Sequence, residues 1–325
     1  MSFGLALLAG IVPMMIYPLF LYWMDRFEKE PLGLLAAVFL WGFFPAALFS
    51  LISQVILGAP FYLADVGGKA VDVISSSIFA PITEEIFKSL AVLAVYLFWR
   101  NEFDGVFDGI LYGSLVGFGF AAIENVLYFL DADASTVLLR GVIFGLNHAF
   151  FTSLTGIGFG IARHSPRRIV RFAAPLLGLL AAMLAHSIHN TSLEMVDFTP
   201  AVLCLTFVAD WGGVALVFIT MVVAIRRERK WIVTQLSDEV SEGTLNAEQY
   251  AITVSPSRRF AILLNAMLSG GPATWWKVAR YLDMLTELAY KKHAFTRRGE
   301  AGASSEAIKA LRTQAAALSL ELADL

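Results

Sequence analysis

Long apolar stretches separated by short loops follow one another through the first 225 residues. Each stretch is long enough to cross a bilayer, which takes about 20 residues. Backbone polar groups in lipid must be satisfied within the segment, so each stretch is predicted to be a helix. Seven such spans are expected, at about 3–23, 34–57, 73–99, 106–130, 137–161, 172–195 and 201–225. The pattern therefore predicts an all-α protein built as a polytopic transmembrane helical bundle.

The pattern changes after Lys230, where apolar residues recur at the three- and four-residue spacing of amphipathic helices. Helical segments are expected at about 231–240, 247–268, 274–293 and 305–322, with Gly, Pro and Ser between them. We therefore expect a transmembrane domain over residues 1–225 and a cytoplasmic helical tail over residues 226–325. The tail could form a small helical domain or an amphipathic lid on the inner leaflet. Nothing in it suggests catalysis, and its partner is unknown.

The basic residues of the loops predict the orientation of the spans. They follow the first, third, fifth and seventh spans, at Arg26 and Lys29, at Arg100, within 163–171 and within 226–230. The loops after the even-numbered spans offer Lys69 and Arg140. Positive residues stay on the cytoplasmic side, so the N-terminus is expected outside and the tail inside.

The composition agrees with a membrane protein. Of the 325 residues, 58% are hydrophobic and 16% are charged, and the mean hydropathy is +0.68. Soluble domains average about 45–50% apolar and about 25% charged residues. The net charge of -3 and the absence of a basic block give no indication of a nucleic-acid partner. The single cysteine, Cys204, excludes an intramolecular disulfide.

Three charged residues interrupt the third apolar stretch: Glu84, Glu85 and Lys88. Each ionisable group inside a bilayer costs at least about 2.5–3.5 kcal/mol on insertion scales, so such groups face a protein interior or a wet cavity. Glu84 and Lys88 are four residues apart and share a helix face. The group is either an ion pair that bridges helices or a glutamate held ionised to deprotonate a water, with Lys88 tuning its pKa.

Other spans carry further polar side chains, namely Glu124, His148, His186, His189 and Asn190. Taken alone, Glu124 is as typical of a contact between helices as of a site, and a lone histidine such as His148 is more typical of hydrogen-bonded packing, whereas His186 and His189 on one helix are a moderate indication of a metal. With a rise of about 1.5 Å per residue, however, Glu84, Glu85, Glu124, His148 and His186 fall in one slab in or near the outer half of the bilayer. We therefore expect these side chains to converge on one buried polar site.

Two kinds of hydrolytic chemistry are open to such a site. Glu124, His148 and His186 could hold a metal ion, Zn²⁺ among the candidates, with a second glutamate as the base. Alternatively, a glutamate could activate water without a metal, while histidine and Asn190 stabilise the oxyanion. The HExxH zinc signature is absent, and the sequence leaves both mechanisms open.

These motifs, taken together, resemble the PrsW family of intramembrane proteases. The resemblance is carried by residues 25–31, by Glu84-Glu85-x-x-Lys88, by residues 119–125, by His148 and by residues 186–190. It implies a bacterial inner-membrane protease related to the CAAX prenyl protease and Abi superfamily. It also implies a membrane-anchored protein substrate, such as an anti-sigma factor, cleaved from the outer side.

Matched by motif, the resemblance makes Glu84 and Glu85 the catalytic pair, with Glu124, His148 and His186 completing the site. Asn190 matches the His-x-x-x-Asn pattern of the wider superfamily. One departure concerns the metal, because that superfamily typically has histidine where this chain has Glu124.

We therefore expect an intramembrane endopeptidase that uses a glutamate-activated water, with or without a metal. The alternative is a proton- or cation-coupled transporter that uses the same buried acids and histidines. A third interpretation is a membrane scaffold in which the polar residues only join helices. Three aspartates near the expected span ends, Asp108, Asp197 and Asp210, are predicted to be capping residues.

Overall fold

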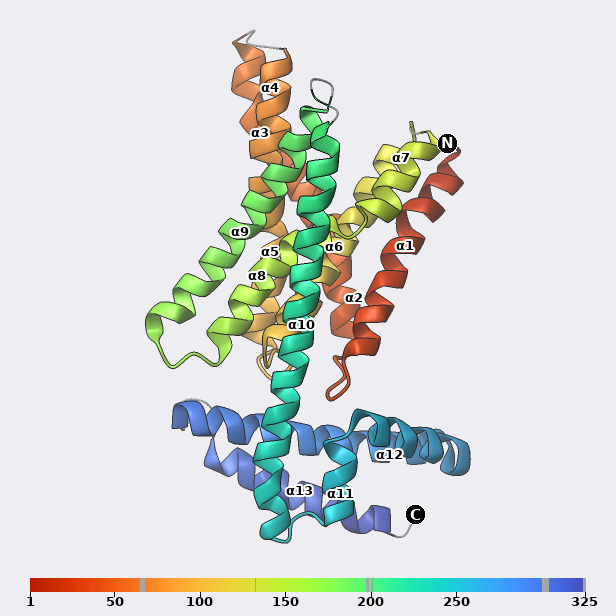
Figure 1. Ribbon diagram of the computed structural model, residues 1–325, viewed down its shortest axis with the longest axis vertical. Helices are drawn as coiled ribbons and strands as arrows, with labels where there is room; N and C mark the ends of the chain where they lie inside the picture. Colours follow the sequence, from red (N-terminus) through yellow and green to blue (C-terminus); the bar gives the residue numbers. More distant parts are fainter. Residues whose placement is uncertain (65–67, 132, 197–198, 200, 300–303, 324–325) are drawn as a thin grey trace. The chain divides into compact units, whose positions relative to one another are not determined.

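The computed structural model describes residues 1–64, 68–131, 133–196, 199, 201–299 and 304–323, and every element in these ranges is a helix (Figure 1). Contacts divide the chain into two compact units. The membrane unit comprises Met1–Trp23 and Glu30–Val222, and the tail unit comprises Met24–Lys29 and Val223–Leu325. The tail unit thus takes in the loop between the first two spans, a grouping that the sequence pattern does not predict.

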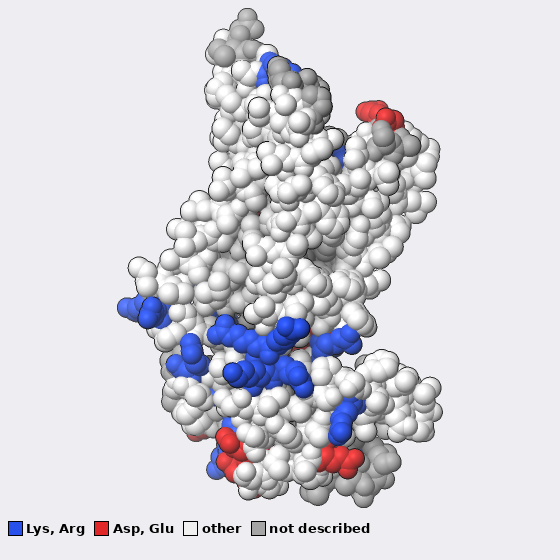
Figure 2. Space-filling view, viewed as in Figure 1, with Lys and Arg blue, Asp and Glu red and all other residues white. Residues whose placement is uncertain are grey.

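The membrane unit consists of long helices joined by short connections and by π-helical turns. In chain order they are α1 Phe3–Met24, α2 Leu32–Trp41, η1 Gly42–Ala46, α3 Ala47–Leu63, α4 Lys69–Ile74, η2 Ser75–Phe79, α5 Ala80–Phe98, α6 Val106–Phe129, α7 Ala134–Leu138, η3 Leu139–Ile143, α8 Asn147–Arg163, α9 Arg168–Glu194 and the first part of α10 Ala201–Ser241. Figure 2 shows few charged side chains over the long helices of this unit on the face viewed. That surface suits contact with lipid.

Helix α6 forms the centre of the membrane unit. In its most apolar stretch 83% of the residues are buried, against 11% for α9 and 17% for α1. The predicted cap at its start is confirmed, because the Asp108 carboxylate accepts hydrogen bonds from the backbone N–H groups of Asp104 and Gly105. Asp197, a second predicted cap, lies outside the described residues.

Glycines let α6 and α8 approach at backbone distance. A Cβ added to Gly109 would lie 2.1 Å from the carbonyl oxygen of Gly156, and one added to Gly117 would lie 2.3 Å from the carbonyl oxygen of His148. Small residues of this kind let membrane helices pack closely where lipid provides no hydrophobic drive. The contact brings together α6, which carries Glu124, and α8, which carries His148.

Six helices among the described residues are long and apolar enough to cross a membrane. They correspond to six of the seven predicted spans. The remaining predicted span, 73–99, folds as α4, η2 and α5, and its stretch from Ala80 to Phe98 contains Glu84, Glu85 and Lys88. With three charged residues, this stretch is not among the six helices apolar enough to span a membrane. The count of seven spans and the orientation therefore stay predictions.

The tail unit is also helical, with boundaries that differ from the predicted ones. It contains the second part of α10, which continues without a break to Ser241, then α11 Ala247–Thr253, α12 Pro256–Arg298 and α13 Ser305–Ala323. Pro256 begins α12, so the predicted helix at 247–268 is divided. The next predicted break is a kink within α12 at Gly271, whose φ of 74° favours glycine.

An apolar core holds the tail unit together around Ile232, Leu236, Leu285 and Leu288, all fully buried. The loop between the first two spans packs into this core through Phe27, which is 3% exposed. Arg259 donates to the Phe27 carbonyl oxygen at 2.5 Å and to the Thr286 hydroxyl at 3.0 Å.

Candidate active site

One turn of α5 places three charged side chains inside the membrane unit. Pro81 lies in the first turn of this helix, directly after the π turn η2. The spacing of the following residues lets the Lys88 ammonium donate to Glu84 at 3.2 Å and to Glu85 at 2.9 Å. The side chains of Lys88 and Glu85 are fully buried, whereas that of Glu84 keeps 8% of its surface exposed. One cation therefore serves two neighbouring carboxylates.

Glu85 makes contacts with two other helices through its remaining lone pairs. Its Oε1 lies 3.0 Å from His186 Nδ1 on α9, and its Oε2 accepts from the Thr152 hydroxyl on α8 at 2.9 Å. A carboxylate only accepts, so His186 carries its proton on Nδ1 and its Nε2 is left as an unprotonated nitrogen. A carboxylate that orients a histidine in this way is the usual support of a metal-binding imidazole.

His148 is held between a cation and a carboxylate. Its Nδ1 lies 3.0 Å from Lys88 Nζ, and its Nε2 lies 2.7 Å from Glu124 Oε2. Because an ammonium only donates, Nδ1 accepts and the proton of the neutral ring lies on Nε2, facing Glu124. Glu124 is also paired with Arg140 at 3.0 Å.

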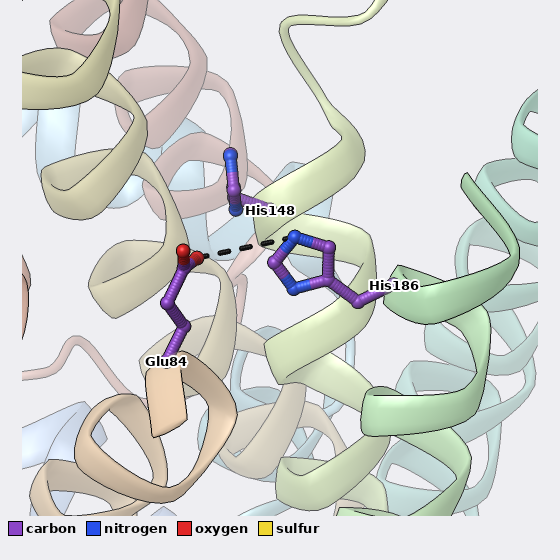
Figure 3. Close-up of side chains that lie close together, drawn as sticks. All are labelled: Glu84, His148 and His186. Carbon is purple, nitrogen blue, oxygen red and sulfur yellow. Dashed lines mark ion pairs between the residues drawn. The ribbon is translucent and has the colours of Figure 1, made fainter. Parts of the chain in front are cut away.

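The structure thus brings Glu84, Glu85, Glu124, His148 and His186 together from α5, α6, α8 and α9. One subset is suited to holding a cation. A carboxylate oxygen of Glu84 and one ring nitrogen each of His148 and His186 lie within 4.8 Å of one another (Figure 3). This subset differs from the predicted one, since Glu124 is engaged by His148 and Arg140 where the sequence suggested a metal ligand.

A cavity of about 150 Å³ opens beside the cluster. Glu124, His148 and His186 line it, together with Asn125 and Asn190. Such a volume has room for several water molecules. Glu84 and Glu85 are not part of this lining, but Glu85 lies 3.0 Å and Glu84 lies 3.9 Å from ring nitrogens of His186, which is.

Asn190 is placed on the cavity wall but does not join the charged cluster. Its amide donates to the Ser76 carbonyl oxygen at 2.8 Å, which connects α9 to the π turn η2. Ser76 in turn donates to Glu194 at 2.9 Å. The contact orients the end of η2 just before the helix that carries Glu84 and Glu85.

A second polar group on the same cavity was not predicted. Asp210, expected to cap a helix near the interface, is instead 4% exposed within α10 and lies 2.7 Å from His189 Nδ1. Asn147 donates to the same Asp210 oxygen at 2.9 Å. The expectation for Asp210 was wrong because α10 begins at Ala201, so Asp210 lies inside this helix, where it contacts Asn147 of α8 and His189 of α9.

Other contributors were also missed. Gln54 on α3 approaches Glu84 Oε1 at 3.4 Å, and Arg140 turns inward onto Glu124 and over the Tyr128 ring. One of the missed residues had a detectable signal: Thr152 follows His148 by four residues and so lies on the same helix face. Gln54 and Arg140 reach the site only through tertiary packing.

The charges of the cluster do not balance. Glu84, Glu85 and Glu124 face two permanent cations, Lys88 and Arg140. With both histidines neutral, the group holds one more negative than positive charge. A cluster that is buried, surplus in negative charge and supplied with imidazole nitrogens is suited to bind a cation or to take up a proton from water.

Helices of this length and a buried acid and histidine cluster beside a cavity define a polytopic membrane protein with a hydrolase-like site. Comparison with known proteins makes the assignment more specific. The model of the PrsW family, described as intramembrane metalloproteases, matches residues 30–225, which is more than half of the chain. The chain therefore belongs to the PrsW family, and it is a protease.

Curated relatives agree. Protease PrsW of Geobacillus kaustophilus is 30% identical over 160 residues, covering 49% of this chain and 68% of that protein. Protease PrsW of Oceanobacillus iheyensis is 29% identical over 187 residues, covering 57% and 81% of the two chains, and that of Bacillus subtilis is 27% identical over 185 residues, covering 56% and 79%. No solved structure matches the chain. Membership of this family favours the hydrolase over the transporter and the scaffold.

Proposed function

We propose that this chain is an endopeptidase of the bacterial cell membrane that hydrolyses a peptide bond of a membrane-anchored protein, with Glu84 as the general base for the attacking water. The observation that carries the proposal is the grouping of the Glu84 carboxylate with His148 and His186 within 4.8 Å, beside a cavity with room for water. An anti-sigma factor is the kind of substrate that the family resemblance implies.

The choice of Glu84 over Glu85 rests on their contacts. Glu85 accepts from Lys88, His186 and Thr152 at 2.9–3.0 Å and has no exposed surface. Glu84 accepts from Lys88 at 3.2 Å and from Gln54 at 3.4 Å, longer contacts that leave it freer to take a proton. Glu85 then acts as a positioning residue that holds His186 and Lys88.

Two donors of the cluster are candidates to meet the charge that develops in the reaction. When the scissile carbonyl is attacked, its oxygen becomes negative, and donors fixed beforehand stabilise that charge without reorganising. His148 Nε2–H faces Glu124 and the Lys88 ammonium is shared among Glu84, Glu85 and His148, so either would have to exchange one of these partners for the substrate oxygen. Glu124 keeps His148 in this tautomer.

The same residues fit a divalent metal ion. Glu84, His148 and His186 would hold it, because one carboxylate and two imidazoles are ligands that Zn²⁺ accepts, and Glu85 already orients His186 from behind. A bound metal would supply Lewis-acid chemistry and a more acidic water.

The relationship of this family to a wider superfamily is also part of this proposal. The spacing of His186 and Asn190 supports a relationship between this family and the CAAX prenyl protease and Abi superfamily. In this chain Asn190, the last residue of that pattern, orients η2 through its hydrogen bond to the Ser76 carbonyl oxygen.

The test is cleavage in proteoliposomes. The full chain is reconstituted with a single-span reporter protein that carries different tags on the two sides of its span, and fragments are followed by mass spectrometry. Glu84→Gln should lower the rate by about 100-fold or more, the usual contribution of a general base. Glu248→Gln, the same change at an exposed position of α11, should leave the rate unchanged. Cleavage at the parental rate by Glu84→Gln would remove Glu84 from the mechanism.

Metal content separates the two mechanisms. Purified parent protein and a His148→Ala/His186→Ala variant are compared by elemental analysis. One equivalent of zinc in the parent and none in the variant supports the metal-assisted mechanism. No metal in either protein, with cleavage retained by the parent, supports the glutamate mechanism alone.

A further inference from the structure

The first half of α12, in the tail unit, has two faces of different character. Ile262, Leu263 and Ala266 pack toward the apolar core of the unit. On the other side, three large apolar side chains recur at four-residue spacing and are exposed: Phe260 by 63%, Leu264 by 45% and Leu268 by 77%. The helix is therefore held in place by its inner face while an outer apolar stripe is left uncovered.

Two tryptophans that follow the kink at Gly271 are exposed as well. Trp275 is 37% exposed and Trp276 is 56% exposed. Exposed large apolar side chains in this number on a folded unit mark an interaction surface. We call Phe260, Leu264, Leu268, Trp275 and Trp276 the apolar stripe.

The exposed charges next to the apolar stripe are mostly basic. No acidic residue occurs in the sequence between Glu248 and Asp283, whereas Arg258, Lys277 and Arg280 lie in this interval and are exposed. The fourth basic residue of the interval, Arg259, is turned inward to Phe27 and Thr286 and also lies 3.4 Å from the partly exposed Asp283 carboxylate. A surface that combines large apolar side chains with mostly basic charges is complementary to an anionic lipid surface.

The covalent connections of the tail unit place it within reach of a bilayer. Its loop, Met24–Lys29, starts at the last residue of α1 and is separated from α2 by Glu30 and Pro31, and its main part begins at Val223 within α10. The helices α1 and α10 and the helical stretch Leu32–Phe61, which α2 begins, are each long and apolar enough to span a membrane. The chain thus enters the tail unit from the membrane at three points.

We propose that the apolar stripe of α12 lies in the headgroup region of an anionic lipid leaflet, with Arg258, Lys277 and Arg280 on the lipid phosphates. Tryptophan is the residue most enriched at that depth, because its ring is apolar and its N–H is polar. The helix would lie in the plane of the membrane as an interfacial amphipathic helix. This lipid contact is independent of the protease activity and lies beyond residue 225, where the match to the family model ends.

The experiment measures depth with spin labels. The full chain is prepared as Cys204→Ser, which removes its single cysteine, and one cysteine is introduced at Leu264 or at Leu268 for a nitroxide label. Thr313, exposed on α13, is the matched control position. In nanodiscs that contain phosphatidylglycerol, collisions with oxygen, which concentrates in lipid, are compared with collisions with a water-soluble nickel chelate.

Labels at 264 and 268 should favour oxygen, and the label at 313 should favour the nickel chelate. In nanodiscs of phosphatidylcholine alone, or in an Arg258→Gln/Lys277→Gln/Arg280→Gln variant, the preference for oxygen at 264 and 268 should decrease. Water-like accessibility at 264 and 268 in the anionic nanodiscs would overturn the proposal. Immobile labels reached by neither reagent would overturn it too, since they would show that a protein surface or a second copy covers the stripe. Unchanged depth without anionic lipid would overturn its electrostatic part.

Discussion

Each of the two units buries a charged cluster, and the clusters differ in how the charges are matched. In the tail unit Glu239 is the fully buried carboxylate and receives two cations, while the other carboxylates near these cations, Asp238 and Glu242, are exposed to water. Lys292 donates to its Oε1 at 2.6 Å, and Arg312 donates to both oxygens at 2.7–3.0 Å. In the membrane unit Glu84 and Glu85 share the single ammonium of Lys88.

This difference distinguishes a structural cluster from a reactive one. A buried carboxylate with two hydrogen-bonded cations has its charge and lone pairs satisfied, and it joins α10, α12 and α13. A pair of carboxylates with one cation keeps a surplus charge that a proton or a metal ion can take up, and here it lies next to a cavity. A buried ion pair is therefore no evidence of catalysis until its charge balance and its access to water are known.

The strongest separation of the two clusters comes from the same substitution made in each. Glu84→Gln should reduce cleavage of the single-span reporter by about 10²–10⁴-fold, because it removes the proposed base, and should leave the tail unit stable. Glu239→Gln should leave cleavage intact and weaken the tail unit, because it removes the charge that Lys292 and Arg312 bind. Cleavage rates and limited proteolysis of the tail check both outcomes. If Glu239→Gln stops cleavage while the tail stays protease-resistant, the division of roles is wrong.

Removing one cation from each cluster tests the charge balance itself. Lys88→Met leaves two buried carboxylates without their shared partner, a loss of about 3–5 kcal/mol in unfolding free energy for a broken buried pair. Lys292→Met leaves Glu239 with Arg312, so its cost should be smaller, about 1–3 kcal/mol. Detergent-induced unfolding followed by pulse proteolysis measures both values. Equal losses would mean that the two clusters are satisfied to the same degree.

The backbone contact that assembles the membrane cluster can be disturbed without touching its charges. Gly109→Ala would place a Cβ 2.1 Å from the Gly156 carbonyl oxygen, so α6 and α8 must separate. We expect a loss of about 1–3 kcal/mol in unfolding free energy, as for other overpacked contacts. Cleavage should fall as well, because the separation lengthens the contact between Glu124 and His148.

Gly212→Ala is the matched control for this helix contact. A Cβ at Gly212 on α10 meets nothing within 4 Å, and alanine is favoured over glycine in a helix by up to about 1 kcal/mol. The control should be neutral or slightly stabilising in the same unfolding measurement. An equal loss in both variants would attribute the effect to glycine content and not to the contact.

The smallest expected effect is a pH dependence confined to the tail unit. Burial, followed by the nearby charges of Arg297 and Arg227, lowers the pKa of His293 below its ordinary value, and the ring stacks on Trp231 at 4.2 Å. Since the folded protein favours the neutral ring, this contribution to stability is fully present above the ordinary pKa of about 6.5 and is lost as the pH falls from that value through the lower pKa of the folded state. Between about pH 8 and pH 5 the unfolding temperature should show a small decrease that is absent in His293→Gln. An identical decrease in that variant would assign the effect to other groups.

Much of the architecture was predictable because lipid imposes simple rules on sequence. The all-helical fold and six of the predicted spans appear among the described helices. Glu84, Glu85, Glu124, His148 and His186 were also identifiable, because an ionisable residue within an apolar stretch needs a partner. The stretch from Ala80 to Phe98 does not have the composition of an ordinary span, because it carries the three charged residues Glu84, Glu85 and Lys88.

The sequence by itself determined that helices would form, that polar residues would be hidden among them, and that the chain would change character near residue 225. Those features depend on local composition and on the absence of water in the bilayer. Only the tertiary structure decided which groups touch: that His148 faces Glu124, that His186 faces Glu85, that Asp210 joins His189, and that Phe27 packs in the tail unit. Helix rotation and close approach, set by glycines on facing helices, are properties of pairs of segments, and one segment's periodicity does not contain them.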